Sequence, residues 1–167
     1  EVRKLALLFP PGKLTLETVE PAVADATRYD VFKLGETLLS GDRARFVRLL
    51  HGLEGEGVAP PLVLWAIAEE IRTLLRVATA VAQRQPLQAA MRDARVWGPR
   101  ADLLPRALRR VPAAEMEEAL LQAAAADRMS KGLVRGNVWE ELERLGLRLM
   151  PPPPARPVEG NRGTLPR

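Results

Sequence analysis

The sequence has no cysteine and a single histidine, His51, among its 167 residues. The absence of cysteine excludes disulfide bonds and thiolate metal ligands. With one histidine, neither a histidine-based metal cluster nor a serine–histidine dyad has support, and we interpret His51 as an ordinary histidine near a helix end. A chain without cysteine fits a reducing compartment, so we expect a cytoplasmic protein.

Long apolar runs are also missing. The longest, residues 58–68, contains 11 residues and two prolines, whereas a membrane-spanning helix needs about 20 apolar residues. We therefore expect no membrane contact. The amino terminus lacks an initiator Met and the apolar core of a secretory signal, so we expect it to be a cut edge of a longer chain.

Aromatic residues are scarce and lie far apart in the sequence. Trp65, Trp97 and Trp139 are each embedded in an apolar helical stripe. They could be platforms on which nucleic-acid bases stack, but wide spacing favours anchors of a core or of a protein interface.

Apolar residues three and four positions apart are abundant, and no stretch alternates for long with the two-residue period of a strand. This pattern predicts an all-α protein with a compact domain of about six to seven helices. After an earlier helix that starts with Thr18 as N-cap, the expected helices cover residues 31–40, 43–53, 60–83, 86–94, 103–111, 113–131 and 138–149. We expect the helix over 60–83 to be the central core helix.

Besides Thr18 and Asp30, which precedes the helix over 31–40, three polar residues are positioned to cap helices. Asp42 precedes the second of these helices, and Asn137 precedes the last one, where Glu140 can complete a capping box. Asp102 as N-cap would put Pro105 in the first turn of its helix, where the missing N–H costs nothing.

A Ser-Lys-Gly triplet at 130–132 suggests a phosphate-binding loop at first sight. A P-loop, however, needs Gly-x-x-x-x-Gly-Lys-Ser/Thr after a strand, and this triplet follows a helix. Lys131 near a helix carboxyl end, Gly132 in a left-handed turn and Asn137 at the next helix start explain the segment as a helix turn.

Acidic pairs occur at 69–70, 117–118 and 140–141. Neighbouring positions on a helix point about 100° apart, so the two carboxylates of a pair cannot both be aimed at one reacting atom. We interpret the pairs as solvated helix faces and expect no catalytic residue, no cofactor and no metal ion.

Positive charge is concentrated between residues 72 and 110, which hold nine arginines and two aspartates. Arginine also outnumbers lysine 21 to 4 in the whole chain. A solvated arginine-rich face is one interpretation, and a surface for nucleic acid or for an acidic partner is the alternative.

Two segments carry a resemblance to a known family. The segments "LWAIAEEIRTLLR" at 64–76 and "ADRMSKGLVRGNVWEELERL" at 126–145, in this order and spacing, resemble the carboxyl-terminal part of the delta subunit of bacterial DNA polymerase III. The resemblance covers roughly residues 1–150. No single motif in it is diagnostic.

The resemblance implies a domain organisation. Residues 1–29 would be the end of a small helical domain like the lid of AAA+ proteins, and residues 30–150 would be the helical collar domain of a clamp loader. Residues 151–167, of which six are proline, have too few large aliphatic side chains to form a core, and we expect a disordered tail.

The resemblance also implies a function. The chain would be a non-enzymatic scaffold that joins the other clamp-loader subunits in DNA replication, with contact to the sliding clamp made by an amino-terminal domain outside this chain. DNA would be at most a weak partner. Because interfaces favour Trp and Arg as anchors, the candidate interface residues are Trp65, Arg72, Arg76, Arg109, Arg110 and Trp139.

Overall fold

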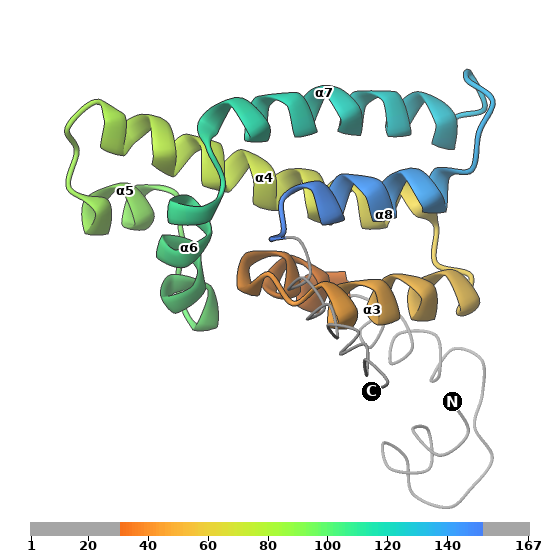
Figure 1. Cartoon of the computed structure of the whole chain (residues 1–167), viewed down its shortest axis with the longest axis horizontal. Coiled ribbons are helices and arrows are strands. Elements are labelled where there is room, and N and C mark those ends of the chain that lie inside the picture. The colour runs from red at the N-terminus through yellow and green to blue at the C-terminus, as the bar shows by residue number, and fades with distance from the viewer. Residues whose placement is uncertain (1–30, 152–167) are drawn as a thin grey trace, which may run out of the picture.

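The computed structural model describes residues 31–151 (Figure 1). Within this range the chain forms seven helical segments and no strand. A helix over 31–40 is followed by α3 (Arg43–Gly55), α4 (Pro60–Ala82), α5 (Leu87–Asp93), α6 (Pro99–Arg110), α7 (Ala113–Ser130) and α8 (Val138–Arg148). The all-α prediction is confirmed for these residues. The helix expected after Thr18, the cap expected at Asp30, the domain assigned to 1–29 and the tail from 152 onward lie outside them.

Helix α4 is the centre of the fold, as its length and apolar periodicity predict. It contacts α5, α6, α7 and α8, and α8 in turn packs on α3 and α7 (Figure 1). The core is built from large side chains that are fully buried: Leu34, Leu38, Leu39, Phe46, Leu50, Leu53, Ile67, Ile71, Leu74, Leu104, Met116 and Leu142. α5 and α6 project together at one end of the molecule (Figure 1).

Helices α3 and α8 approach closely at one point because Gly146 has no side chain. A Cβ atom at Gly146 would lie 2.8 Å from Cε2 of Phe46 and closer still to two other atoms of the same ring. The Phe46 ring is completely buried. Glycine at 146 therefore provides the space that this ring occupies.

The predicted caps at Asp42 and Asn137 are confirmed. The Asp42 carboxylate accepts a hydrogen bond from the Arg45 N–H at 3.0 Å, and Asn137 Oδ1 accepts one from the Trp139 N–H at 3.0 Å. Glu140 Oε1 accepts from the Asn137 side-chain amide at 3.1 Å. Glu140 thus binds the side-chain amide of Asn137, whereas in a capping box it would bind the backbone N–H of Asn137.

The expected start of α6 at Asp102 is wrong. The helix begins at Pro99, after Gly98 with a φ of +63°, so Asp102 lies in its first turn and Pro105 lies inside it. Proline at the first helical position is favourable, and this earlier start brings Arg100 to a carboxylate on α4. The longer helix includes Pro105 in its interior, where proline is disfavoured, and it also forms the contact between Arg100 and Glu70 of α4.

Two arginines hydrogen-bond the carboxyl ends of other helices. Arg43 Nη1 donates to the carbonyls of Leu147, Met150 and Pro151 at 3.0–3.3 Å. Arg110 donates to the carbonyls of Leu149, Leu38 and Leu39 at 3.1–3.3 Å. A cation at a helix carboxyl end is favourable because the last carbonyls lack helical partners. These two side chains join segments that are far apart in the sequence.

Candidate subunit interface

One face of α4 carries three of the predicted interface residues. Trp65, Arg72 and Arg76 are all exposed, and with Glu69 between them they follow a spacing of four, three and four residues. This spacing places the four side chains in one line along a helix. The sequence prediction for these three residues therefore describes a single continuous surface, which we call the α4 face.

The apolar end of the α4 face is an aromatic pair. The Trp65 ring lies edge-on to the Phe32 ring, with centroids 6.3 Å apart and an interplanar angle of 76°. The exposed fractions are 49% for Trp65 and 58% for Phe32, so both rings are open to solvent. Beside them is a depression lined by Val31, Phe32, Leu62 and Trp65. Exposed aromatic rings beside a depression are typical of protein interfaces.

A groove lies between α4 and α7 on the other side of Trp65. Its volume is about 380 Å³. Small side chains, Ala68, Ala123 and Ala124, line it together with Leu120 and Arg72. The alanine run at 123–126 predicts close approach of a neighbouring helix, and α7 does pack against α4.

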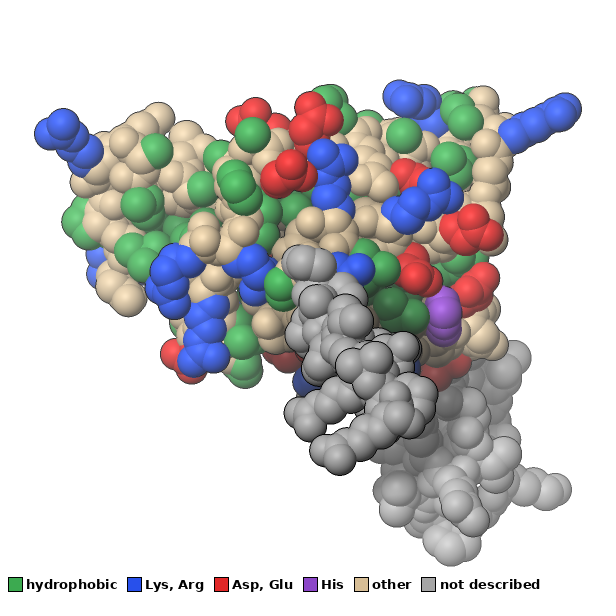
Figure 2. All heavy atoms as spheres, in the orientation of Figure 1, with side chains coloured by type: hydrophobic (Ala, Val, Ile, Leu, Met, Phe, Trp, Pro, Cys, Tyr) green, Lys and Arg blue, Asp and Glu red, His purple; other side chains and the backbone are tan. Residues whose placement is uncertain are grey.

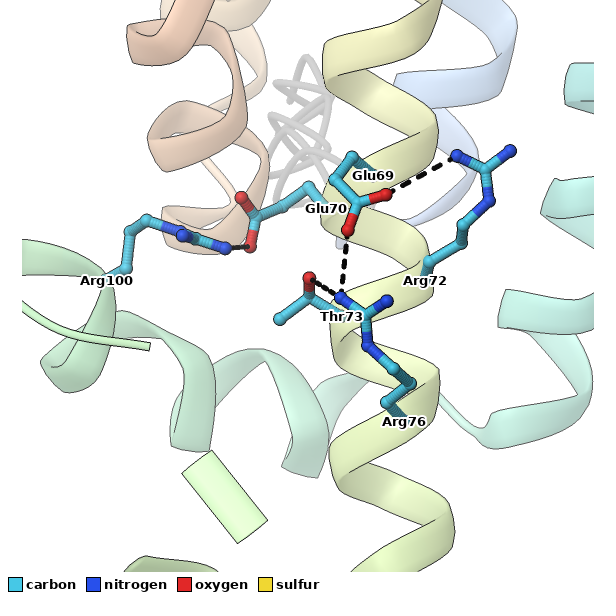
Figure 3. Close-up of polar contacts among 6 residues, drawn as sticks. All are labelled: Glu69, Glu70, Arg72, Thr73, Arg76 and Arg100. Carbon is cyan, nitrogen blue, oxygen red and sulfur yellow. Dashed lines mark hydrogen bonds and ion pairs between the residues drawn. The ribbon is translucent and has the colours of Figure 1, made fainter. Parts of the chain in front are cut away.

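Glu69 orders the two arginines of the α4 face. Its carboxylate lies 2.9 Å from Arg76 Nη2 and 3.6 Å from Arg72 Nη1, and Arg76 also donates to Thr73 Oγ1 at 2.9 Å (Figure 3). All three charged side chains are 40–54% exposed, so their pairing adds little to stability. Its effect is to hold two guanidinium groups in defined positions on an exposed surface.

Glu70 points away from Glu69 and is buried (Figure 3). The two carboxylates diverge as predicted, but the prediction of a solvated pair is wrong for Glu70, which pairs with Arg100 of α6 at 3.0 Å. Burial raises the pKa of the Glu70 carboxyl, and the hydrogen bond from Arg100 opposes this shift. Arg100 Nε is buried without a partner among the described residues. The pair links α4 to α6 and borders a small cavity beside Gly35.

The other three predicted interface residues lie on other helices. Arg109 is exposed on α6, whereas the Arg110 guanidinium binds backbone carbonyls of its own chain. Burial lowers the pKa of Arg110, and a guanidinium remains protonated in spite of this. Trp139 on α8 is partly buried against the core. The structure does not bring these three residues to the α4 face.

The turn between α7 and α8 has the architecture expected for it. Gly132 has a φ of +72°, its N–H donates to Met129, and the Leu133 N–H donates to Arg128, which is the hydrogen-bond pattern of a Schellman motif. Lys131 Nζ binds Asp127 at 2.6 Å. His51, which we expected near a helix end, lies in the last turns of α3 and contacts Glu143 at 3.0 Å.

The sequence prediction missed two residues of the α4 face, Phe32 and Glu69. Phe32 belongs to the helix over 31–40, and only packing places it beside Trp65. Glu69 had a usable signal, because it lies four residues after Trp65 and seven before Arg76. Within residues 31–151 no three acidic or histidine side chains gather as metal ligands, and none of the helices is both long and apolar enough to cross a membrane.

The described residues thus define an all-helical domain that displays an exposed aromatic and arginine surface. The family model described as "Processivity clamp loader gamma complex DNA pol III C-term" matches residues 31–154, and the chain belongs to this family. It is 33% identical over 148 residues to DNA polymerase III subunit delta of Escherichia coli, covering 89% of this chain and 43% of the relative.

A second relative is DNA polymerase III subunit delta of Haemophilus influenzae. The identity is 26% over 153 residues, which cover 87% of this chain and 44% of the relative. The chain thus spans less than half the length of the curated relatives it matches. The resemblance to the carboxyl-terminal part of the delta subunit is confirmed.

Proposed function

We propose that this chain is an assembly domain of a clamp loader, the collar through which the delta subunit joins the other loader subunits. In this function it supports the loading of sliding clamps in DNA replication without performing catalysis itself. Contact with the sliding clamp belongs to a part of the subunit outside this chain. A replication role is compatible with the cytoplasmic location expected from the absence of cysteine.

The observation that carries this proposal is the α4 face. Interfaces concentrate their binding free energy in a few aromatic and arginine side chains next to pockets. Trp65 has a depression on one side and the α4–α7 groove on the other, and Arg72 lines that groove. The Phe32 and Trp65 rings are exposed side by side, and a contiguous exposed apolar patch is a feature of interaction sites.

Co-purification tests the proposal. The 167-residue chain is mixed with the other clamp-loader subunits of the same organism, and complex formation is measured by size-exclusion chromatography. The test variant is Trp65→Ala with Arg72→Ala. The matched control is Trp97→Ala with Arg92→Ala, which removes the same two residue types from exposed positions off the α4 face.

We expect the wild-type chain and the control to join the complex. The Trp65/Arg72 variant should bind with a loss of about 2 kcal/mol or more, the size of an interface hot spot. Circular dichroism establishes that each variant is folded. A folded wild-type chain that fails to join the complex would contradict the proposed function, and equal binding by both variants would contradict the α4 face as the interface.

A further inference from the structure

Carboxylates that are shielded from solvent have basic partners in this fold, with one exception. Within residues 31–151 six carboxylate side chains are buried or partly buried. The sixth, Glu36, forms no hydrogen bond or ion pair within this range. On the face of the molecule shown in Figure 2, acidic and basic side chains are interspersed. The other five pair with a lysine, an arginine or a histidine at 2.6–3.4 Å: Glu69, Glu70, Asp127, Glu141 and Glu143.

Glu36 lines the cavity beside Gly35, between the helix over 31–40 and α4. Its volume is about 110 Å³. The aromatic pair of the α4 face, Phe32 and Trp65, forms part of its wall, and both rings are open to solvent. The charged residues of the lining are three glutamates and one arginine: Glu36, Glu69, Glu70 and Arg100. We call this site the Glu36 cavity.

No cation of the described residues neutralises Glu36. Arg100, the one guanidinium in the lining, donates to Glu70 at 3.0 Å. Burial is the main cause that raises the pKa of the Glu70 carboxyl, and repulsion by Glu36 adds to the rise. A carboxylate that is drawn out of water without a cation costs free energy. The Glu36 cavity therefore offers an incoming cation a negative charge that the chain itself leaves unpaired.

The aromatic wall favours the same class of ligand. A cation is attracted to the face of an aromatic ring, most strongly to tryptophan. A guanidinium group is planar, so it can stack on the Trp65 indole while it donates two hydrogen bonds to a carboxylate. An acidic side chain would be repelled by Glu36, and an aliphatic side chain would leave Glu36 without a partner. Neither of these ligands accounts for the unpaired carboxylate.

We propose that the Glu36 cavity binds an arginine side chain of the protein that docks on the α4 face. The guanidinium pairs with Glu36 and stacks on the ring of Trp65 or Phe32. This inference rests on the assembly function proposed above and names the chemistry of the partner's anchor residue. The two arginines of the α4 face do not line the cavity, and Glu69 binds both of them.

The first test uses the 167-residue chain alone and N-acetyl-arginine amide as the probe. Two-dimensional nuclear magnetic resonance follows the indole N–H of Trp65, which is assigned with the Trp65→Phe variant. Trp97 is 63% exposed and does not line the cavity, so its indole N–H reports unspecific stacking. N-acetyl-glutamine amide and N-acetyl-glutamate amide are the neutral and acidic control probes.

Glu36→Gln is the test variant, because it removes the charge and keeps the shape of the side chain. The matched control is Glu54→Gln, which removes an exposed carboxylate without a partner from α3. Since Glu36 has no internal partner, Glu36→Gln should not lower Tm. A lower Tm would show that Glu36 already has a role inside the fold and would contradict the proposal.

We expect the arginine probe to shift the Trp65 indole signal in a saturable way and to leave the Trp97 signal nearly unchanged. Glu36→Gln should weaken this binding about tenfold, the size of one lost charge-assisted hydrogen bond. Glu54→Gln should bind like the wild type. An equal response to the neutral or acidic probe, or equal affinity of the wild type and Glu36→Gln, would overturn the proposal.

The second test repeats the assembly measurement with the other clamp-loader subunits. Glu36→Gln should again weaken binding about tenfold. Glu36→Lys should weaken it further, because the lysine repels an incoming guanidinium. Tighter binding by Glu36→Gln would mean that the partner's anchor is acidic and would overturn the inference.

The assembly measurement also separates the two proposals. A wild-type chain and a Glu36→Gln variant that join the complex equally well would contradict the arginine anchor and leave the assembly function intact. A folded wild-type chain that fails to join the complex would overturn the assembly function and, with it, the partner named here.

Discussion

Replacing Gly146 with alanine should destabilise the protein, although alanine is the better helix former. In an exposed helix, the change from glycine to alanine stabilises by about 1 kcal/mol. At Gly146 the new Cβ would overlap three atoms of the buried Phe46 ring, the farthest of them at 2.8 Å. Overpacking of this kind costs roughly 1–3 kcal/mol. Because the ring has no exposed side toward which it can move, we expect the upper part of that range.

The expected net effect of Gly146→Ala is therefore a loss of about 2 kcal/mol, which lowers Tm by about 4–8 °C for a chain of this size. Gly52→Ala is the matched control. Gly52 lies in α3, and no atom from another part of the structure lies within 4 Å of the position that its Cβ would take, so alanine there should stabilise by about 0.5–1 kcal/mol. Urea denaturation measures the free energy of unfolding of both variants.

A third variant identifies the cause. If the Phe46 ring is the obstacle, Phe46→Leu removes the atoms that the new methyl group would meet, and Gly146→Ala should cost at least about 1 kcal/mol less in that background. The reasoning is refuted if Gly146→Ala stabilises as Gly52→Ala does, or if its cost is the same with phenylalanine and with leucine at 46.

Three further predictions concern polar contacts. Arg110→Ala should lower the free energy of unfolding by about 2 kcal/mol, because three carbonyls lose their charged hydrogen-bond donor. Arg109→Ala should change the free energy of unfolding by less than about 0.5 kcal/mol, because Arg109 is exposed. Equal losses for the two variants in urea denaturation would contradict the structural role of Arg110. Asn137→Ala should lower the stability of α8 by about 1 kcal/mol, and Asn137→Asp should lower it much less, because the aspartate still accepts the cap hydrogen bonds. Hydrogen exchange of the amides in α8 measures both losses. Unchanged exchange in the Asn137→Ala variant would argue against the cap. Burial raises the pKa of Glu70 in the folded state, so proton binding to this carboxyl adds to the free energy of unfolding below the unfolded-state pKa, and this addition is lost as the pH rises through the folded-state pKa. Glu70→Gln has no such proton to lose and should therefore gain stability relative to the wild type as the pH rises. A stability difference between the two proteins that is constant between about pH 4 and 8 would exclude this linkage.

The candidate interface was partly predictable because part of it lies on one helix. Trp65, Arg72 and Arg76 share the α4 face through sequence spacing alone. Phe32 and the alanines of α7 were not assignable to the same surface, because they come from other helices and reach it only through packing. Arg109 and Arg110 looked equivalent in sequence, yet one is exposed and the other binds the carboxyl ends of two distant helical segments.

The local architecture was determined by the sequence itself. Apolar periodicity specified the helices, Asp42 and Asn137 specified two starts, and Gly132 specified the turn before α8, because each signal acts within about one helical turn. Tertiary structure alone decided that Glu70 is buried against α6 and that Gly146 makes room for the Phe46 ring. Each of those outcomes depends on an atom contributed by a different helix, and the burial and pairing free energies that decide them do not exist until the helices pack together.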